Sequence, residues 1–490
     1  MSFFNEIMSV VNDIVWSLPL IGLCMGAAVF FSFYFRLPQV RLFKDMVNSL
    51  TEKGDDDVGI SPFQTFATTV GSRVGMGNIA GVATAIYFGG PGAVFWMLFM
   101  GFFAASSALV ETTLAQAYKD VTDDGEYVGG PQLFIEKALN KKWLAVLFAL
   151  ATVIGPGILM PGLHTYSIAS TFENAFGVDM LIVGIVSVAI LGLVVWGGIK
   201  RIGKVAELMA PVMTVIYVLI AVVILVMNFE KFPGAVALIV KSAFGLEPLF
   251  AGIIGAAIQW GVKRGLYSNE AGQGSGAIVS AAAETSHPVK QGLIQALSVF
   301  IDTLIVCSSS AIIIMVTEKY NVINGNGEFI VSHIPDIEYG IRWAQEGLIS
   351  AFGSLGGKAL AIIIIMFVFT SLMGYYYEAE STMRYLTKNS SAAVKAMKII
   401  FLGSTFSGVL FNGEVIWMMG DIGAGLMAWF NIIAILLLSK KAKEIFADYE
   451  NQRNSGLDPM FNPVDVGIVD QTGAWKKYAQ RRIKAQRKEG

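Results

Sequence analysis

The chain has 490 residues, of which 54% are hydrophobic and 15% are charged, and its formal net charge is −2. Soluble chains usually carry about a quarter charged residues, so the composition excludes an ordinary soluble protein and predicts a membrane protein with many spans. Cys24 and Cys307 both lie in apolar runs, which argues against a disulfide framework or a thiolate metal site. The three histidines are scattered without the spacing of metal ligands.

Eleven apolar segments are long enough to cross a bilayer, because a helix needs about 20 apolar residues to span the hydrocarbon core. The seventh segment is too long and too interrupted to form one straight helix. In chain order the predicted spans are 14–36, 62–88, 91–117, 143–170, 178–199, 206–229, 248–284, 288–317, 359–386, 394–411 and 414–438.

Lysine and arginine gather in alternate connections between these segments, and cytoplasmic connections carry the excess of both residues. This pattern predicts a multi-pass protein of the cell membrane with its N-terminus outside and its C-terminus in the cytoplasm. The external loop 318–357 contains a stretch, 338–352, whose apolar spacing predicts a short surface helix that acts as a structural cap or a gate-like lid. The tail 439–490 is basic and cytoplasmic, and we expect it to be solvated and partly disordered from Phe446 onward.

The second segment contains "GSRVGMGNIAG", residues 71–81, in which four glycines accompany Ser72, Arg73 and Asn78. The spacing of the glycines would also suit close helix packing. A cation near mid-span costs at least about 2.5 kcal/mol, however, so Arg73 indicates a polar interior. Glycine permits unwinding, and a membrane tolerates freed backbone groups where they line a cavity. We therefore predict a discontinuous helix whose broken ends bind an anionic group and a cation.

A second interrupted stretch, "GVKRGLYSNEAGQGSGAIVSAAAE", covers residues 261–284 of the seventh segment. Five glycines and several polar side chains break its apolar run. Two glycine-broken segments five spans apart are typical of an inverted five-plus-five repeat, with the substrate site where the repeats meet. The sequence therefore predicts one five-helix repeat over 62–229 and another over 248–438.

A third stretch, residues 367–386, places the adjacent hydroxyls of Thr370 and Ser371 in an apolar span. Each hydroxyl could simply bond to a carbonyl one turn earlier. Together with the first break, the hydroxyls and freed carbonyls could instead supply the oxygens that Na+ requires. The three tyrosines 375–377 are either pocket wall or part of an interfacial belt.

Two acidic residues lie within spans. Glu111 is about a turn from the inner end of its span, where it either pairs with Arg73 or reaches the interface. Asp302 lies mid-span, and we expect it to have an interior partner, with a proton-relay role as the alternative.

These stretches together resemble the alanine or glycine:cation symporter family, the sodium:alanine symporters. The likeness covers about residues 60–438, and one departure is Leu98, where the family usually has tryptophan. The matching motifs are "GSRVGMGNIAGVATAI", "GGPGAVFWM", "RGLYSNEAGQGS", "AAAETSHPVKQGL", "VFIDTLIVC" and "FTSLMGYYYEAES".

The resemblance implies an all-α polytopic protein with a LeuT-type inverted repeat and one extra N-terminal transmembrane helix, followed by a cytoplasmic loop, in 1–61. It also implies the transport of small amino acids, chiefly alanine and glycine, together with Na+. Residue by residue, the amides at Gly75, Met76, Gly77 and Asn78 would bind the substrate carboxylate. Carbonyls around Asn269, Gly272, Gln273 and Gly274 would bind its ammonium group. Na+ would bind the carbonyls of Gly71, Val74 and Phe367 and the hydroxyls of Thr370 and Ser371.

The sequence thus predicts Na+-coupled uptake of small neutral amino acids by alternating access. Met76 stands where the family often has threonine, and its bulk favours a small substrate. A proton-coupled carrier, with Asp302 or Glu270 carrying the proton, is the alternative, and an ion channel is a further one. No Ser–His, paired Asp or His–metal arrangement at membrane depth predicts an enzyme. The oligomeric state stays open.

Overall fold

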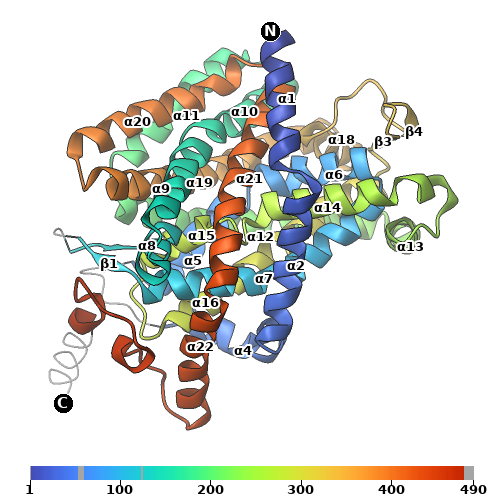
Figure 1. The fold of residues 1–490 in the computed structure, drawn as a ribbon. Helices are drawn as coiled ribbons and strands as arrows, with labels where there is room; N and C mark the ends of the chain where they lie inside the picture. Colours follow the sequence, from blue (N-terminus) through green and yellow to red (C-terminus); the bar gives the residue numbers. More distant parts are fainter. Residues whose placement is uncertain (1, 53–59, 123–124, 479–490) are drawn as a thin grey trace.

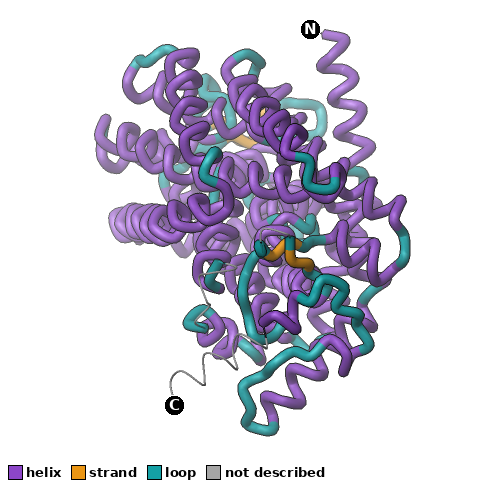
Figure 2. The backbone as a smooth tube through the Cα atoms, turned by 90° about the vertical axis from the view of Figure 1, so that its left-hand side faces the viewer, coloured by secondary structure: helices purple, strands orange, loops and turns teal. Residues whose placement is uncertain are grey.

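Helices make up nearly all of the secondary structure, as the tube in Figure 2 shows. The computed structural model describes residues 2–52, 60–122 and 125–478. The N-terminal helix α1 lies at one end of the bundle and α22 lies at the other (Figure 1). An odd number of membrane crossings would place the two helices in this way.

The N-terminal half contains the extra helix and the first predicted repeat. Two short strands, β1 (Asp120–Val121) and β2 (Tyr127–Val128), pair antiparallel between α7 and α8. The helices are α1 (Ser2–Val15), α2 (Leu18–Tyr34), α3 (Pro38–Arg41), α4 (Phe43–Ser49), α5 (Pro62–Arg73), η1 (Gly77–Gly81), α6 (Val82–Gly89), α7 (Gly92–Ala117), α8 (Pro131–Leu139), α9 (Lys142–Ile154), η2 (Gly155–Leu159), α10 (Pro161–Phe176), α11 (Met180–Val195) and α12 (Gly198–Met227).

The C-terminal half contains the second predicted repeat and the tail. Strands β3 (Asn321–Ile323) and β4 (Phe329–Ser332) form a second antiparallel pair. The helices are η3 (Phe229–Lys231), α13 (Phe232–Ala243), η4 (Pro248–Ile253), α14 (Ile254–Asn269), α15 (Ser275–Ala281), α16 (Pro288–Val299), η5 (Phe300–Cys307), α17 (Ser308–Val316), α18 (Ile341–Phe352), α19 (Ser354–Thr387), α20 (Ser391–Phe406), η6 (Ser407–Val409), α21 (Gly413–Leu437), α22 (Ser439–Asn454) and η7 (Pro463–Val466).

Each of the eleven predicted spans corresponds to a helical segment, but their lengths differ. Within the described residues, eight helices are long and apolar enough to cross a membrane, or nine if the bent pair α13–α14 is one span. The interrupted α5–α6 pair is not among the eight, and α11 is a shorter apolar helix. The chain is therefore an integral membrane protein, while the count of eleven crossings stays a prediction.

Both predicted interruptions are present in the structure. The first helix of the pair, α5, starts with a capping box in which Ser61 and Gln64 bond reciprocally, and it ends at Arg73. The chain bends at Val74 and Gly75 before η1 continues as a π-type turn. The second interruption, residues 270–274, separates α14 from α15. Figure 1 shows α5, α14 and α15 in the middle of the bundle, among α7, α12 and α19.

The predicted surface helix is present as α18, which buries Ile341, Ala344 and Leu348 against the bundle. The hairpin of β3 and β4 in the same loop was not predicted, because its strands are too short to show a clear alternation.

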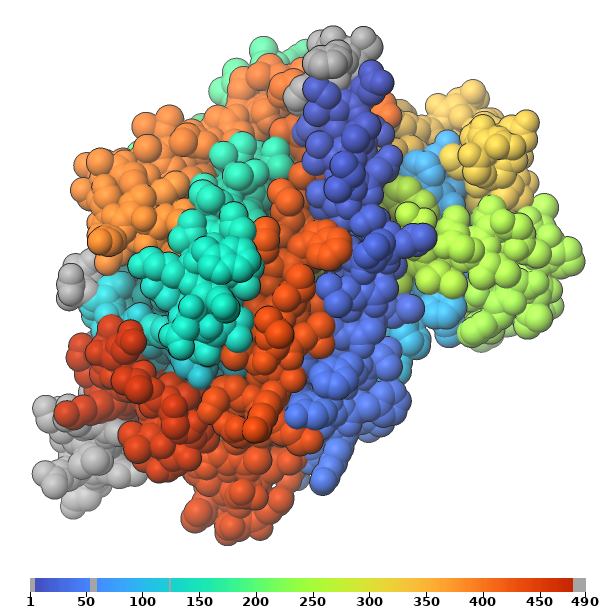
Figure 3. Space-filling model, in the orientation of Figure 1, coloured from blue at the N-terminus to red at the C-terminus, as the bar shows by residue number. Residues whose placement is uncertain are grey.

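From Phe446 onward, more than half of the described residues of the tail are exposed, as a solvated tail requires, but several of its aromatic residues are not. Helix α22 packs Phe446 and Tyr449 into the core, and further along the chain Phe461 and Trp475 are also buried. The reason is tertiary, since these isolated aromatic residues find a surface on the ends of the spanning helices next to α22. Figure 3 shows the segment folded back onto this end of the molecule. Residues 479–490 lie outside the described part.

Candidate transport site

The side chain of Asn78 binds a free backbone amide of the first interruption. The backbone N–H of Gly75 donates to Asn78 Oδ1 at 2.7 Å. The Asn78 amide in turn donates to Asp302 Oδ1 at 2.6 Å and to the Asp302 carbonyl at 3.1 Å. One of the amides that we expected to bind a substrate carboxylate is therefore occupied by an internal amide oxygen in this conformation.

Asp302 joins the two interruptions. It lies in η5, a π-type segment, and is fully buried. Besides Asn78 it accepts from Ser268 of α14 at 3.0 Å and from Thr303 at 2.8 Å. The expectation of an interior partner is confirmed, with partners from both broken spans. Every donor here is neutral, so Asp302 acts as a hydrogen-bond centre and is not one half of an ion pair.

The second interruption consists of residues in the left-handed region of the backbone. Glu270, Gly272 and Gly274 have φ angles of 54°, 89° and 88°. Glycine is required at Gly272 and Gly274, because a Cβ there would also lie 2.5 Å from Ile432 and Pro131 respectively.

Polar side chains of the second interruption satisfy its free backbone groups. Gln273 Nε2 donates to the Leu266 carbonyl at 2.7 Å, and Asn269 Oδ1 accepts the Ala271 N–H at 3.0 Å. Asn269 also donates to Thr303 at 3.1 Å. Asn269 and Gln273 therefore stabilise the unwound backbone in this conformation.

Glu111 of α7 forms hydrogen bonds to the second interruption. Its Oε2 accepts the Gly274 N–H at 3.2 Å and the Asn431 amide of α21 at 2.6 Å. Asn431 also donates to the Gly272 carbonyl at 2.8 Å. Among the described residues, Glu111 forms no ion pair, so neither of its two expected arrangements is observed. The contact is with the unwound backbone instead.

The two hydroxyls of α19 lie against α5 at the first interruption. Ser371 Oγ donates to the carbonyls of Gly71 and Phe367 at 3.2 and 3.1 Å, and Thr370 Oγ1 donates to those of Met366 and Phe367, both at 2.9 Å. Each hydroxyl thus bonds to the carbonyl one turn earlier, as the alternative expected, and Ser371 also reaches α5. A Cβ on Gly71 would lie 2.8 Å from Thr370 Cβ, so only glycine allows this approach. Gly71, Phe367, Thr370 and Ser371 thus form one cluster of neutral oxygens, and Val74 follows at the end of α5.

Gly75 is enclosed by side chains from two elements, and Gly77 lies against a third. A Cβ at this position would lie 2.3 Å from Ser371 Oγ and 3.7 Å from His164 Nε2, and His164 is buried on α10. A Cβ on Gly77 would lie 2.9 Å from Ser268 Cα. Sequence analysis missed His164, because a lone histidine in an apolar span shows no spacing signal.

Arg73 lies between the two interruptions. It is 2% exposed, and it donates to the Gln295 carbonyl at 3.2 Å and to Ser298. A Cβ on Gly276 would lie 2.4 Å from its Nη2, so the guanidinium crosses the start of α15. Four buried carboxylates attract it without forming an ion pair within the described chain. They are Glu270, Glu111, Asp302 and Glu378.

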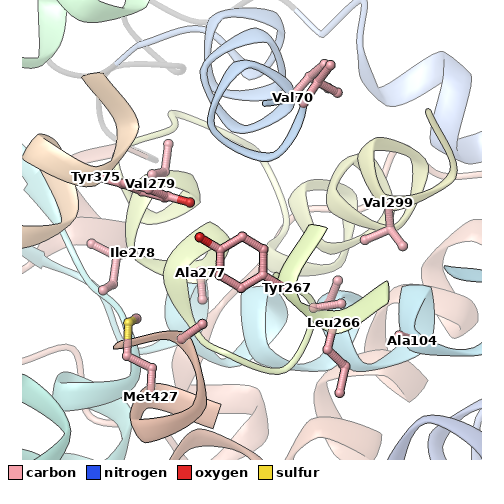
Figure 4. Packing of buried hydrophobic residues seen from close by; sticks show 14 of the residues in the cluster. Val70, Ala104, Leu266, Tyr267, Ala277, Ile278, Val279, Val299, Tyr375 and Met427 are labelled. Carbon is pink, nitrogen blue, oxygen red and sulfur yellow. The ribbon is translucent and has the colours of Figure 1, made fainter. Parts of the chain in front are cut away.

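Two of these carboxylates are bound by serines near the break. Ser275 donates to Glu270 at 2.8 Å, and Ser72 lies 3.4 Å from Glu378 of α19. Figure 4 shows Tyr267 and Tyr375 turning their hydroxyl ends toward each other in this region. The three tyrosines 375–377 are buried inside the protein, which favours pocket wall over interfacial belt.

A buried charge cluster connects α14 to α21 beside the site. Arg264 binds Asp421 through two nitrogens at 2.6 and 3.0 Å, and Lys263 Nζ lies 2.8 Å from the same carboxylate. Trp260 and Trp417 face the Arg264 guanidinium at 5.2 and 4.7 Å from their ring centroids. Sequence analysis did not single out Asp421, although an acidic residue inside an apolar span is itself a signal of a partner.

Met76 faces a different space from the other predicted site residues. It lines a small cavity of about 40 Å³ together with Tyr166, Tyr339 and Trp417. Ile341 and Arg342 of α18 also line this cavity, and none of the oxygen-cluster residues does. The structure therefore groups most of the predicted substrate residues at the two breaks, and it places Met76 toward the predicted outer face.

The sequence profile of the sodium:alanine symporter family matches residues 1–463. The chain belongs to this family. It is 47% identical over 468 residues to YrbD of Bacillus subtilis (strain 168), which carries the name of a sodium/proton-dependent alanine carrier; the match covers 95% of this chain and 96% of YrbD.

Two further relatives differ in the substrate that their names give. The sodium/proton-dependent alanine carrier protein of Bacillus sp. (strain PS3) is 42% identical, over 90% of this chain and 100% of that one. GlnT of Bacillus subtilis (strain 168), which carries the name of a sodium/glutamine symporter, is 40% identical over 93% of each chain. The symporter family therefore makes this chain a secondary transporter and not an enzyme.

Solved structures agree with the LeuT-type fold. A Na+-coupled sialic acid symporter in a substrate-bound outward-open state superposes with a TM-score of 0.50 at 13% identity and covers 96% of both chains. MhsT in complex with L-phenylalanine gives 0.53 at 14% identity and covers 87% of this chain and 96% of MhsT. At these identities the likeness concerns the fold alone.

Proposed function

We propose that the chain takes up small neutral amino acids, chiefly alanine or glycine, by symport with Na+. The observation that carries this proposal is the cluster of carbonyls and hydroxyls at Gly71, Phe367, Thr370 and Ser371, directly beside the Gly75 amide. A hard cation prefers neutral and carboxylate oxygens, and at a broken helix it neutralises freed carbonyls while nearby amides bind a carboxylate.

In this proposal the substrate carboxylate displaces Asn78 Oδ1 from the Gly75 N–H, and the amides of Met76, Gly77 and Asn78 add to its binding. The ammonium group binds carbonyls of the second break, around Asn269, Gly272, Gln273 and Gly274. Na+ binds the oxygen cluster together with the Val74 carbonyl. Each ligand raises the affinity for the other by the same factor, because both order the same break.

The crowding around Gly75 supports a small substrate. Ser371, His164 and Ser268 all approach the first break closely, so a long substrate side chain would displace at least one helix. The name of GlnT as a glutamine symporter makes glutamine the essential competitor to test.

The orientation belongs to the same proposal, with the N-terminus outside and the tail cytoplasmic. The inward Na+ gradient and the membrane potential, worth about 2.3 kcal/mol per charge per 100 mV, then drive uptake.

The test is uptake of labelled alanine into proteoliposomes, with and without an inward Na+ gradient, competed by glycine, glutamine and phenylalanine. Wild-type protein should accumulate alanine only with the gradient. The T370A/S371A double variant removes two of the proposed Na+ ligands and should weaken Na+-dependent alanine binding by well over about tenfold, since each lost ligand costs about 1 kcal/mol or more. A serine outside the cluster, Ser309→Ala, is the matched control. Unchanged Na+ dependence in the double variant would remove the sodium assignment.

A further inference from the structure

Glu111 has one carboxylate oxygen, Oε1, for which no donor among the described residues lies in hydrogen-bonding geometry. Its Oε2 accepts from Gly274 and Asn431, whereas Oε1 is buried without a partner in the described chain, and the residue has 0% exposed surface. Leaving a buried charged acceptor unsatisfied costs several kcal/mol. The geometry therefore suits a species that binds to Oε1 and removes or balances its charge.

The other buried carboxylates of the spanning helices differ from Glu111 in this respect. Asp302 has donors from Asn78, Ser268 and Thr303. Neither Glu270 nor Glu378 has a buried oxygen that lacks a partner in the described residues. The two acids that sequence analysis considered as proton carriers, Asp302 and Glu270, are therefore the less suitable ones.

Asn431 supplies the complementary acceptor. Its amide nitrogen donates to Glu111 Oε2 and to the Gly272 carbonyl, while its Oδ1 is also buried without a partner among the described residues. A carboxyl group that carries a proton on Oε1 becomes a donor. The neighbouring Asn431 Oδ1 is an acceptor that such a donor can satisfy after a small rotation of either side chain.

The groups that act on the Glu111 carboxylate come from three elements. Arg73 of α5 attracts it, and the backbone of Gly272 and Gly274 at the break and the Asn431 amide of α21 donate hydrogen bonds to it. Pro131 of α8 and Phe148 of α9 lie beside Gly274 and are apolar, and α16 approaches α7 through Gly292 beside Thr113. Burial favours the neutral acid, whereas Arg73 and these hydrogen bonds favour the carboxylate, and the balance between them decides whether Glu111 carries a proton.

We propose that Glu111 Oε1 is a proton-binding site of this symporter, coupled to the second break. The proposal rests on the proposed transport function and assigns a residue to proton coupling, which the names of YrbD and the Bacillus sp. (strain PS3) carrier give those two proteins. The proton comes from the water on the side from which the amino acid enters, binds the Glu111 carboxylate, and leaves to the water on the other side. The neutral oxygens at Thr370 and Ser371 can hold Na+, but they do not bind a proton near neutral pH, whereas a carboxylate can.

Proton binding is coupled to substrate binding through the two hydrogen bonds that Glu111 Oε2 accepts. A neutral carboxyl group is a weaker acceptor than a carboxylate, so protonation loosens the Gly274 N–H and the Asn431 amide. Both groups hold the unwound backbone that would bind the substrate ammonium group. Proton binding and substrate binding therefore change each other's affinity by the same factor.

The first experiment measures protons moved per alanine in proteoliposomes that contain a pH-sensitive dye, at equal Na+ on both sides. The wild type should acidify the lumen when alanine enters. In E111Q, which keeps an acceptor for Gly274 and a donor for Asn431 but cannot release a proton, the ratio of protons to alanine should fall at least about tenfold. E173Q, at an exposed glutamate of α10, is the control and should keep the wild-type ratio. An unchanged ratio in E111Q would overturn the assignment.

The second experiment needs no transport. Infrared difference spectra of the purified protein during acidification should show the carbonyl band of a protonated carboxyl group that is absent in E111Q and present in D302N. If E111Q does not fold, E111D replaces it and should shift the band in frequency. A wild type that lacks the band, or a band that persists unchanged in E111Q, overturns the proposal. Absence of Na+-driven alanine uptake by the wild type would instead overturn the proposed function, and the infrared result would still decide whether Glu111 binds a proton.

Discussion

Asn78 connects the two interrupted helices through a chain of hydrogen bonds. Its Oδ1 accepts the Gly75 N–H of the first break, and its amide nitrogen binds Asp302, which also holds Ser268 of the second broken span. All four are buried, so each bond is made in a medium of low dielectric constant, where losing one partner leaves the other unsatisfied. A change at Asp302 should therefore alter the hydrogen bond between Asn78 and Gly75, although Asp302 does not contact Gly75.

We predict that D302N weakens alanine binding by about 10- to 100-fold, because a hydrogen bond to a charged group is worth about 1.5–3 kcal/mol. The amide oxygen of the new asparagine can still accept from Asn78, but its NH2 group would then face the Ser268 and Thr303 hydroxyls, which donate to Asp302 in the wild type. Binding can be measured by scintillation proximity with labelled alanine at saturating Na+. D179N is the control, since Asp179 caps the exposed start of α11 and asparagine caps equally well. Wild-type affinity in D302N would show that Asn78 is oriented without Asp302.

At the scale of elements, the start of α16 depends on a neutral histidine. His287 Nδ1 accepts the Val289 N–H at 3.2 Å, and Nε2 lies 3.2 Å from Asp448 of α22. Burial lowers the pKa of His287 from its ordinary value of 6.5, although the contact with Asp448 opposes this change. The hydrogen bond from His287 lowers the pKa of Asp448 below 3.8. A neutral imidazole that accepts at Nδ1 and donates at Nε2 satisfies both contacts.

This cap predicts a loss of stability in acid. Because the folded pKa of His287 is lowered, its contribution is complete above pH 6.5 and is lost as the pH falls through the folded value. Protonation of Nδ1 removes the cap, which is worth about 1 kcal/mol. The melting temperature in detergent should fall on mild acidification, and less so in H287N, because asparagine caps the helix without titrating. Equal acid sensitivity of both proteins would contradict this role.

At the scale of the whole molecule, the C-terminal segment closes over the predicted inner ends of the spanning helices. Phe461 donates its N–H to the Ser286 carbonyl at 2.9 Å, and its ring meets Trp475 at 4.8 Å. Lys119 Nζ lies 4.6 Å from the Trp475 ring centroid and donates to the Ala283 carbonyl just beyond α15. The tail is thus attached to the chain just after α15, and Trp475 lies beyond the residues that the family profile matches.

We predict that W475A detaches this segment. Removing a buried tryptophan costs about 3–5 kcal/mol, which exceeds what the remaining polar contacts of the segment contribute. Trypsin should then cleave at Lys476 and Lys477 much faster than in the wild type, as followed by mass spectrometry. V469A, at an exposed position of the same segment, is the control. Cleavage at the wild-type rate would show that Trp475 does not hold the tail.

The sequence was most informative where local chemistry alone decides the structure. Glycine clusters with polar residues cannot continue an apolar helix cheaply, and both interruptions were therefore located within a few residues of Val74 and Glu270. The adjacent hydroxyls Thr370 and Ser371 were likewise recognisable. The partners of Glu111 and Arg73 were not recognisable. Glu111, for example, binds the Gly274 N–H and the Asn431 amide, which are 163 and 320 positions away and meet it only after the helices pack.

By itself the sequence determined that the chain lies in a membrane and that two of its spans are interrupted, while the LeuT-type symporter class followed from the resemblance of its motifs to a known family. Hydrophobic length and glycine content act within one segment, so they can be read without the rest of the molecule. Only the tertiary structure decided that Asn78 occupies the Gly75 amide, that Glu111 leaves one oxygen unsatisfied, and that the tail packs against the bundle. Each of these depends on which distant surfaces meet, and burial sets the strength of hydrogen bonds and charges only once those surfaces are in contact.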